Sequence, residues 1–383
     1  MASKTIQLSK ISPVMLSFIV MGFVDIVGVS VGYVKKDFGL SDSLAQLIPS
    51  IALVWFFLLS VPVGILQDRF GKRNMLNLGM AMTGLGMLVP LFHYSFPVML
   101  TAFLMLGIGN TIVQVSANPL LHLVVPENKF GSFMSLSQFV KAICSLMGPI
   151  LATWFATAYG NWRIVFTVYA VTSLLAVLWL YFTKIEETTG GHKPASFVSC
   201  FKLLGNSFIL ILVIGIFLIV GSDVGMNSNI ANYLKSTFHI SLEKASLGIS
   251  LYFTALMIGR FFGAVILNWI ATRPFLILTS LLALCGLALM IFAPSLILAE
   301  IAIFNTGLGS ANLFPLVFTI AVKKMPQRVN EISGLMIMAV AGGAAIPPLM
   351  GFVSQHYGAV MSIFILVGCI AYVFLSSLIL GKK

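Results

Sequence analysis

Asp25, Lys141 and Asp223 are among the ionisable residues that stand inside otherwise apolar stretches of this sequence. A charged group placed in hydrocarbon costs about 2.5–3.5 kcal/mol on insertion scales, so such residues need a partner or a wet cavity. Whether a buried carboxyl holds a proton depends on whether a cation lies beside it. A carboxylate that meets a lysine in one conformation and leaves it in another can therefore take up and release a proton. We predict this chemistry for these three residues.

Amide side chains form a second set in the same apolar stretches. Gln114 and Asn118 are four residues apart and would share one helix face, and Gln138 and Lys141 are three apart and would share another. Amides both donate and accept hydrogen bonds, which suits the hydroxyls of a sugar. The predicted substrate-binding residues are therefore Gln114, Asn118, Gln138, Lys141, Asn227, Asn232 and Asn312. For each amide a second interpretation stays open, a hydrogen bond between packed helices. For Asp223 the alternatives are a pair with Arg260 or the capping of an unwound turn.

The stretches that carry these residues are long enough to cross a bilayer. Of the 383 residues 59% are hydrophobic and 9% charged, whereas about a quarter of a soluble protein is charged. Apolar runs of about 20 residues span the hydrocarbon core and must be helical there. The sequence predicts an all-α polytopic membrane protein with twelve transmembrane helices, spans 1 to 12, at 11–34, 43–66, 74–93, 96–122, 129–158, 162–184, 206–234, 243–269, 273–292, 295–322, 329–355 and 358–381.

The polar stretch 185–205 separates two predicted bundles of six helices, residues 1–184 and 206–383. Fifteen of the 22 Lys and Arg residues fall on one set of loops and five on the other. This bias places both termini in the cytoplasm. It also accounts for the net charge of +11 without a nucleic-acid partner. The four cysteines lack metal-binding spacing, so we expect no metal and no cofactor.

The two halves repeat each other. Shifted by 200 residues, Tyr33 meets Tyr233, Lys35 meets Lys235 and Arg73 meets Arg273. Two bundles in the same orientation form a parallel repeat. Such folds bind substrate between the halves near the middle of the membrane and alternate access by rocking.

The loop between spans 2 and 3 carries a specific motif. Gly64, Asp68, Arg69, Gly71, Lys72 and Arg73 stand in the pattern G-x-x-x-D-R-x-G-K-R. This pattern resembles the signature loop of the major facilitator superfamily, which implies a conformational latch formed by these six residues. Gly64 would allow a close helix approach, and Asp68 would pair with a cation or a helix N-terminus. The second half keeps only Ala264, Asn268 and Arg273 at these positions, so we expect an asymmetric latch.

Further motifs resemble the fucose/proton symporter family. They are Gln114–Asn118–Pro119, Gln138, Asn312–Pro315 and the run from Gly342 to Gly351, with Asp25 at the family's span-1 aspartate. The resemblance implies a secondary transporter that imports a monosaccharide by proton symport, in a bacterial inner membrane, with sugar, protons and lipid as partners. Two residues depart from the family: Gln114 replaces a carboxylate, and Lys141 replaces a residue that is usually asparagine.

In the superfamily's architecture spans 1 and 5 are neighbours. Asp25 and Lys141 lie about 21 Å and about 18 Å along them at 1.5 Å per residue, so we expect the two to pair in one conformation. A permanent pair would instead make a proton-independent facilitator. An efflux carrier also stays open, because Gly148 and Pro149 lie near the place where such carriers have a Gly-Pro element. The sequence has no catalytic triad or phosphate-binding loop, so we expect a carrier and not an enzyme. We also expect this carrier to be a monomer.

Overall fold

The computed structural model describes residues 6–45, 47–187 and 196–379. Lys4, Lys193, Lys382, Lys383 and the part of the expected linker at 188–195 lie outside these residues. Within them the first half consists of α1 (Leu8–Gly22), η1 (Phe23–Asp25), α2 (Ile26–Phe38), α3 (Asp42–Ala45), α4 (Leu47–Phe70), α5 (Lys72–Phe92), α6 (Phe96–Val124), η2 (Glu127–Lys129), α7 (Phe130–Tyr159) and α8 (Ile164–Phe182).

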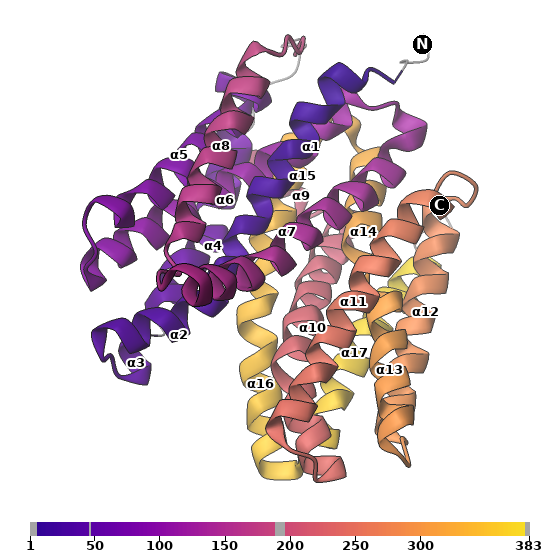
Figure 1. The fold of residues 1–383 in the computed structure, drawn as a ribbon. Coiled ribbons are helices and arrows are strands. Elements are labelled where there is room, and N and C mark those ends of the chain that lie inside the picture. The colour runs from indigo at the N-terminus through magenta and orange to yellow at the C-terminus, as the bar shows by residue number, and fades with distance from the viewer. Residues whose placement is uncertain (1–5, 46, 188–195, 380–383) are drawn as a thin grey trace. The chain divides into compact units, whose positions relative to one another are not determined.

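The short helix α9 (Phe197–Leu203) follows within the expected linker. The second half consists of α10 (Ser207–Phe238), α11 (Leu242–Ile266), α12 (Thr272–Ile291), α13 (Leu296–Ser310), α14 (Leu313–Lys324), η3 (Pro326–Arg328), α15 (Val329–Met338), η4 (Ala339–Ala341), α16 (Gly342–Tyr357) and α17 (Ala359–Ile379). Figure 1 shows their course.

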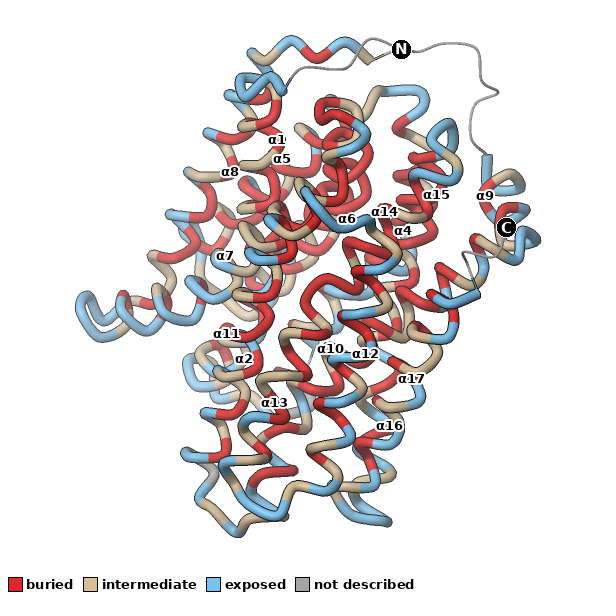
Figure 2. The backbone as a smooth tube through the Cα atoms, turned by 90° about the vertical axis from the view of Figure 1, so that its right-hand side faces the viewer, coloured by how far each residue is buried: buried red, intermediate tan, exposed pale blue. Residues whose placement is uncertain are grey.

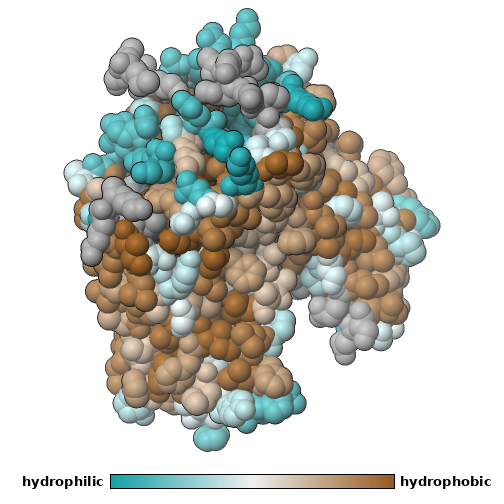
Figure 3. All heavy atoms as spheres, turned by 180° about the vertical axis from the view of Figure 1, so that it is seen from behind, coloured by the Kyte–Doolittle hydropathy of each residue, from teal (hydrophilic) through white to brown (hydrophobic). Residues whose placement is uncertain are grey.

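Twelve helical spans in the described residues are long and apolar enough to cross a membrane. Each agrees with its predicted span to within four residues at either end, so the predicted helix number and class are confirmed. Large apolar side chains remain exposed on these helices, for example Leu175, Trp179 and Phe182 on α8. Figure 3 shows this hydrophobic surface in brown, with hydrophilic residues gathered toward the helix ends. Such a surface is stable against acyl chains and not against water.

Three spans are interrupted in mid-course. Span 1 passes through the 3₁₀ turn η1, span 10 breaks between α13 and α14 at Ala311 and Asn312, and span 11 passes through η4. Span 7, in contrast, is one continuous helix, α10. The interpretation of Asp223 as the cap of an unwound turn is therefore wrong, because every turn around it is helical.

The described chain divides into two compact units that do not follow the sequence halves completely. Unit 1 contains residues 1–130, 137–200 and 327–338, and unit 2 contains 131–136, 201–326 and 339–383. The first turns of α7 thus belong to unit 2, where the Ser132 hydroxyl donates to the Ala264 carbonyl of α11. Helix α15 belongs to unit 1, where it packs on α4. Each unit therefore contains the beginning of one span from the other half of the sequence.

Helix α6 is the centre of unit 1, and its residues from Asn110 to Leu121 are all buried. Figure 2 shows the buried residues in red. Small residues bring the backbones together: a Cβ on Gly107 would lie 2.2 Å from the Ala52 carbonyl oxygen of α4. In unit 2 the corresponding contact joins α13 to α11, where a Cβ on Gly307 would lie 2.8 Å from the Tyr252 carbonyl oxygen. Close backbone contact is the usual way in which transmembrane helices associate.

Candidate functional site

Asp25 ends the η1 turn and faces α7. Its carboxylate accepts a hydrogen bond from the Ser145 hydroxyl, which also lies 3.0 Å from the Lys141 carbonyl oxygen. A Cβ on Gly22 would lie 2.8 Å from that carbonyl oxygen and 2.9 Å from Cβ of Cys144. Only glycine fits there, so spans 1 and 5 touch as predicted. The structure therefore brings Asp25 to the helical turn that begins at Lys141, and the ion pair itself stays a prediction.

Tyr169 of α8 completes this site and was not predicted. Its ring stacks on Phe23 with centroids 3.8 Å apart and planes 8° apart. Its hydroxyl is buried and has no hydrogen-bond partner among the described residues. A Cβ on Gly148 would lie 2.8 Å from that hydroxyl, which places the phenol less than one turn beyond Ser145 on α7. Nothing in the sequence marked Tyr169, because an aromatic residue in an apolar span is usually packing.

A ladder of amides runs along α6. Asn118 donates to the Gln114 carbonyl at 3.2 Å, and the Gln114 side chain donates to Oδ1 of Asn110 at 3.0 Å. Asn110 in turn donates to the carbonyls of Val20 and Met21 at 3.2 and 3.1 Å. The ladder therefore anchors span 1 directly before its 3₁₀ turn. Asn110 was missed, although its spacing of four from Gln114 continues the same helix face.

The remaining unit 1 amide of the predicted substrate set is Gln138, which is 7% exposed on α7. Gln114 is equally buried, and Asn118 is 1% exposed. The hydrogen bonds that Gln114 and Asn118 donate lie within α6, so they do not favour the helix-packing interpretation for either residue. Their role in substrate binding stays a prediction, as does that of Gln138.

In unit 2 Asp223 accepts a hydrogen bond at 2.8 Å from the Tyr252 hydroxyl of α11. Arg260, the partner that the sequence suggested as an alternative, donates from Nε to the Ala311 carbonyl at 3.3 Å. The arginine thus contacts the break in span 10, where a carbonyl is left without a helical donor.

The other unit 2 amides differ in their surroundings. Asn312 fills the break in span 10, is 1% exposed and donates to the Gly259 carbonyl at 2.7 Å. Asn232 is exposed and donates to the Ser354 hydroxyl at 3.0 Å, near the ends of α10 and α16. Asn227 is half-buried on α10. The structure thus brings Asn312 into helix packing, places Asn232 near a helix end, and leaves Asn227 partly accessible.

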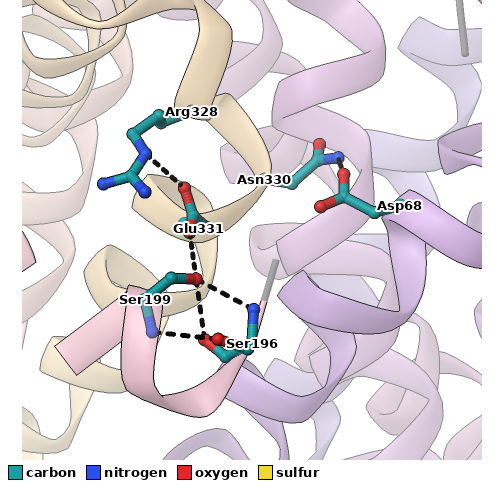
Figure 4. Close-up of polar contacts among 6 residues, drawn as sticks. All are labelled: Asp68, Ser196, Ser199, Arg328, Asn330 and Glu331. Atoms are coloured by element: carbon teal, nitrogen blue, oxygen red, sulfur yellow. Dashed lines mark hydrogen bonds and ion pairs between the residues drawn. The ribbon is translucent and has the colours of Figure 1, made fainter. Parts of the chain in front are cut away.

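The predicted latch residues lie around the crossing of α4 and α15. A Cβ on Gly64 would lie 2.7 Å from the Asn330 carbonyl oxygen, and a Cβ on Gly334 would lie 2.9 Å from that of Ser60. The predicted close approach at Gly64 is thereby confirmed. Asp68 accepts a hydrogen bond at 2.5 Å from the Asn330 amide (Figure 4). Asn330 is a partner that the sequence did not indicate.

Next to this contact α9 packs on α15. Glu331 is 6% exposed, lies 3.0 Å from the Arg328 guanidinium and accepts a hydrogen bond from the Ser199 hydroxyl at 2.6 Å (Figure 4). Cys200, which belongs to the polar stretch 185–205, is buried in α9. Burial raises the pKa of its thiol to about 12, the Glu331 carboxylate adds to the rise, and Arg328 opposes it.

The second part of the latch motif begins α5, and its partner was missed. The carboxylate of Glu187 accepts hydrogen bonds from the backbone N–H groups of Lys72 and Arg73 at 2.7 and 2.8 Å. The Arg73 guanidinium donates to the Tyr181 carbonyl of α8 at 2.7 Å. Gly71 has φ +81°, and a Cβ there would lie 3.2 Å from the carboxylate. Glu187 thus caps the N-terminus of α5, while Arg69 of the motif is exposed.

A sequence model of the Major Facilitator Superfamily matches residues 14–348. This chain belongs to the major facilitator superfamily. It is a multi-pass membrane transporter and not an enzyme, as predicted.

Relatives within the superfamily align with nearly the whole length of this chain. The "Glucose/galactose transporter" of Brucella abortus biovar 1 (strain 9-941) is 23% identical over 384 residues, which are 96% of this chain and 93% of that protein. The crystal structure of the E. coli fucose:proton symporter superposes with a TM-score of 0.84 at 18% identity and covers 97% of this chain and 98% of its own. A proton:xylose symporter superposes with a TM-score of 0.75 at 16% identity, over 98% and 95% of the two chains. These two structures support the fold.

Proposed function

We propose that this superfamily member is a secondary active transporter that imports a monosaccharide or a related small polar solute by proton symport. The observation that carries the proposal is Asp25, a carboxylate at a helix break inside the membrane, in contact with the Lys141–Ser145 turn. The names of the relatives, a glucose/galactose transporter and sugar/proton symporters, support a sugar as the solute.

Proton uptake at Asp25 would act on span 1 through its partners. As a carboxylate, Asp25 accepts the hydrogen bond of the Ser145 hydroxyl and would attract the Lys141 ammonium. Protonation removes the charge and weakens both interactions, since hydrogen bonds to ionised groups are about twice as strong as neutral ones. Span 1 then becomes free to bend at η1, which follows directly after the Val20 and Met21 carbonyls that Asn110 holds. Asp223, bonded to Tyr252, is the proposed second proton site.

The latch residues would control the conformational equilibrium and would not touch substrate. The Asp68–Asn330 and Ser199–Glu331 hydrogen bonds hold α15 on α4 and α9. Alternating access requires that this contact form in one state and release in the other. For the sugar, the half-buried Asn227 and the polar turn at Gln138 and Lys141 are the proposed contacts. The proposed setting is a bacterial inner membrane, with a monomer whose termini are cytoplasmic, because the basic loops lie on that side.

A proton-independent facilitator is the second candidate. Gln114 is neutral where the fucose/proton symporter family has a carboxylate, and its amide is held by Asn110. A carrier that lost one proton-binding group in this way could retain Asp25 as a structural partner of α7.

Transport by proteoliposomes distinguishes these functions. A competition panel of monosaccharides, amino sugars and sugar acids identifies the substrate, and uptake is then measured with and without an inward proton gradient. Symport predicts accumulation with the gradient only, and its loss in Asp25→Asn with exchange retained. Glu127→Gln, which changes an exposed carboxylate, is the matched control. Uptake that ignores the gradient in the wild type would support the facilitator, and no inhibition by any sugar would refute the sugar assignment.

A further inference from the structure

The repeat equivalents α5 and α12 begin in the same way. Arg73, in the first turn of α5, donates to the Tyr181 carbonyl in the last turn of α8. Arg273, in the first turn of α12, donates to the carbonyls of Ser377 and Leu378 at 2.9 Å each, in the last turns of α17. The arginine therefore fastens span 3 to span 6 in one half and span 9 to span 12 in the other.

The two helices differ in the groups that lie at the backbone N–H groups of their first turns. In α5 the Glu187 carboxylate accepts from two of them. The N-cap of α12 is Ala271, whose side chain forms no capping hydrogen bond. At this end of unit 2 there is instead a pocket of about 320 Å³, lined among others by Phe208, Thr272, Arg273, Lys323, Lys324 and Ser377.

The described lining of the pocket is positively charged and contains no acid. Three of its lining residues are cations, and the Lys324 ammonium lies 5.6 Å from the centre of the Phe208 ring. The acidic side chains that the structure describes after position 205 are Asp223, Glu300 and Glu331, and none of these three lines the pocket. The amides at the start of α12 add the positive end of the helix dipole. The site is therefore built for an anion with several acceptor oxygens.

The location of the pocket indicates where that anion comes from. It lies at the ends of spans 7, 9, 10 and 12, where a bilayer has its headgroups. Directly after Ser377 the side chains of Leu378 and Ile379 are exposed and apolar, as expected for residues that face acyl chains. We propose that this pocket binds the phosphate of an anionic phospholipid headgroup, which takes the place that Glu187 occupies in the first half. Basic pockets between transmembrane helices are known to suit such headgroups.

The test measures retention of phosphatidylglycerol against phosphatidylcholine by native mass spectrometry on the full chain. The site variant is Lys323→Ala with Lys324→Ala, which spares the structural Arg273. Each lysine near an anionic surface contributes about a fivefold gain in binding, so the double variant should bind phosphatidylglycerol about 30-fold more weakly. Lys202→Ala, which changes an exposed lysine of α9, is the matched control and should stay within about twofold. Thermal melting confirms that both variants are folded.

Four outcomes would overturn the proposal. The double variant could bind as the wild type does, or the control could lose as much, which would indicate general surface charge. Inorganic phosphate at about 10 mM could displace the lipid, which would make free phosphate the ligand. Deletion of residues 380–383 could abolish binding, which would assign it to Lys382 and Lys383.

Discussion

The crossing of α4 and α15 predicts a measurable shift between conformations. In Gly334→Ala the new Cβ would lie 2.9 Å from the Ser60 carbonyl oxygen and 3.2 Å from Cα of Val61. Ordinary contacts need about 3.5 Å, so the helices must separate by about 0.5 Å. Overpacking of this kind costs about 1–3 kcal/mol, which raises the population of the released state about 5- to 150-fold.

Cys200 reports on this release. Its thiol is 1% exposed in α9 and has a pKa raised to about 12. Its reactive thiolate is therefore scarcer at neutral pH than that of an ordinary thiol. When α15 leaves, burial and the Glu331 charge are removed, the pKa falls and labelling becomes fast. The rate of labelling by a water-soluble thiol reagent is thus proportional to the released population.

The assay uses a background in which Cys144, Cys285 and Cys369 are replaced by alanine. Gly334→Ala should label Cys200 about 5- to 150-fold faster than this background. Gly351→Ala is the matched control, because it adds a methyl group in the same span with nothing within 4 Å. Equal labelling in both variants would show that the crossing does not control the exposure of α9, and the latch argument would fail.

Three further predictions concern residues that the sequence did not mark. Glu187→Gln should lower the unfolding free energy by about 1–2 kcal/mol in a thermal melt, since it removes a charged cap from α5, whereas Glu186→Gln, on an exposed neighbour, should not. Asn110→Ala should cost about 2–3 kcal/mol and increase hydrogen exchange before η1, and unchanged exchange would refute the anchoring role. Tyr169→Phe should melt no lower than the wild type, because it removes a hydroxyl that has no partner among the described residues; a clear destabilisation would mean that the hydroxyl is bonded.

The membrane spans could be predicted because the hydrocarbon core requires long, apolar helices, whatever other helices they pack against. The contact of Asp25 with α7 followed from the resemblance, which supplied the neighbour relation of spans 1 and 5. Glu187 could not be found in this way, since it binds backbone amides that lie 115 and 114 residues away and every residue type offers such amides. The breaks in spans 10 and 11 were also missed, although Pro315, which has no N–H to donate to the Ala311 carbonyl, is a local signal for the first of them.

The first residues of span 11 belong to unit 1, and this has a consequence for biosynthesis. The surface of α4 around Gly64 is completed only by residues 327–338, which leave the ribosome more than 250 positions later. Throughout that interval the surface of α4 around Gly64 in the nascent first bundle lacks its partner helix and faces the bilayer or an insertase. Two fragments divided in the 188–195 region should therefore be short-lived when each is produced alone, and should stabilise each other when produced together.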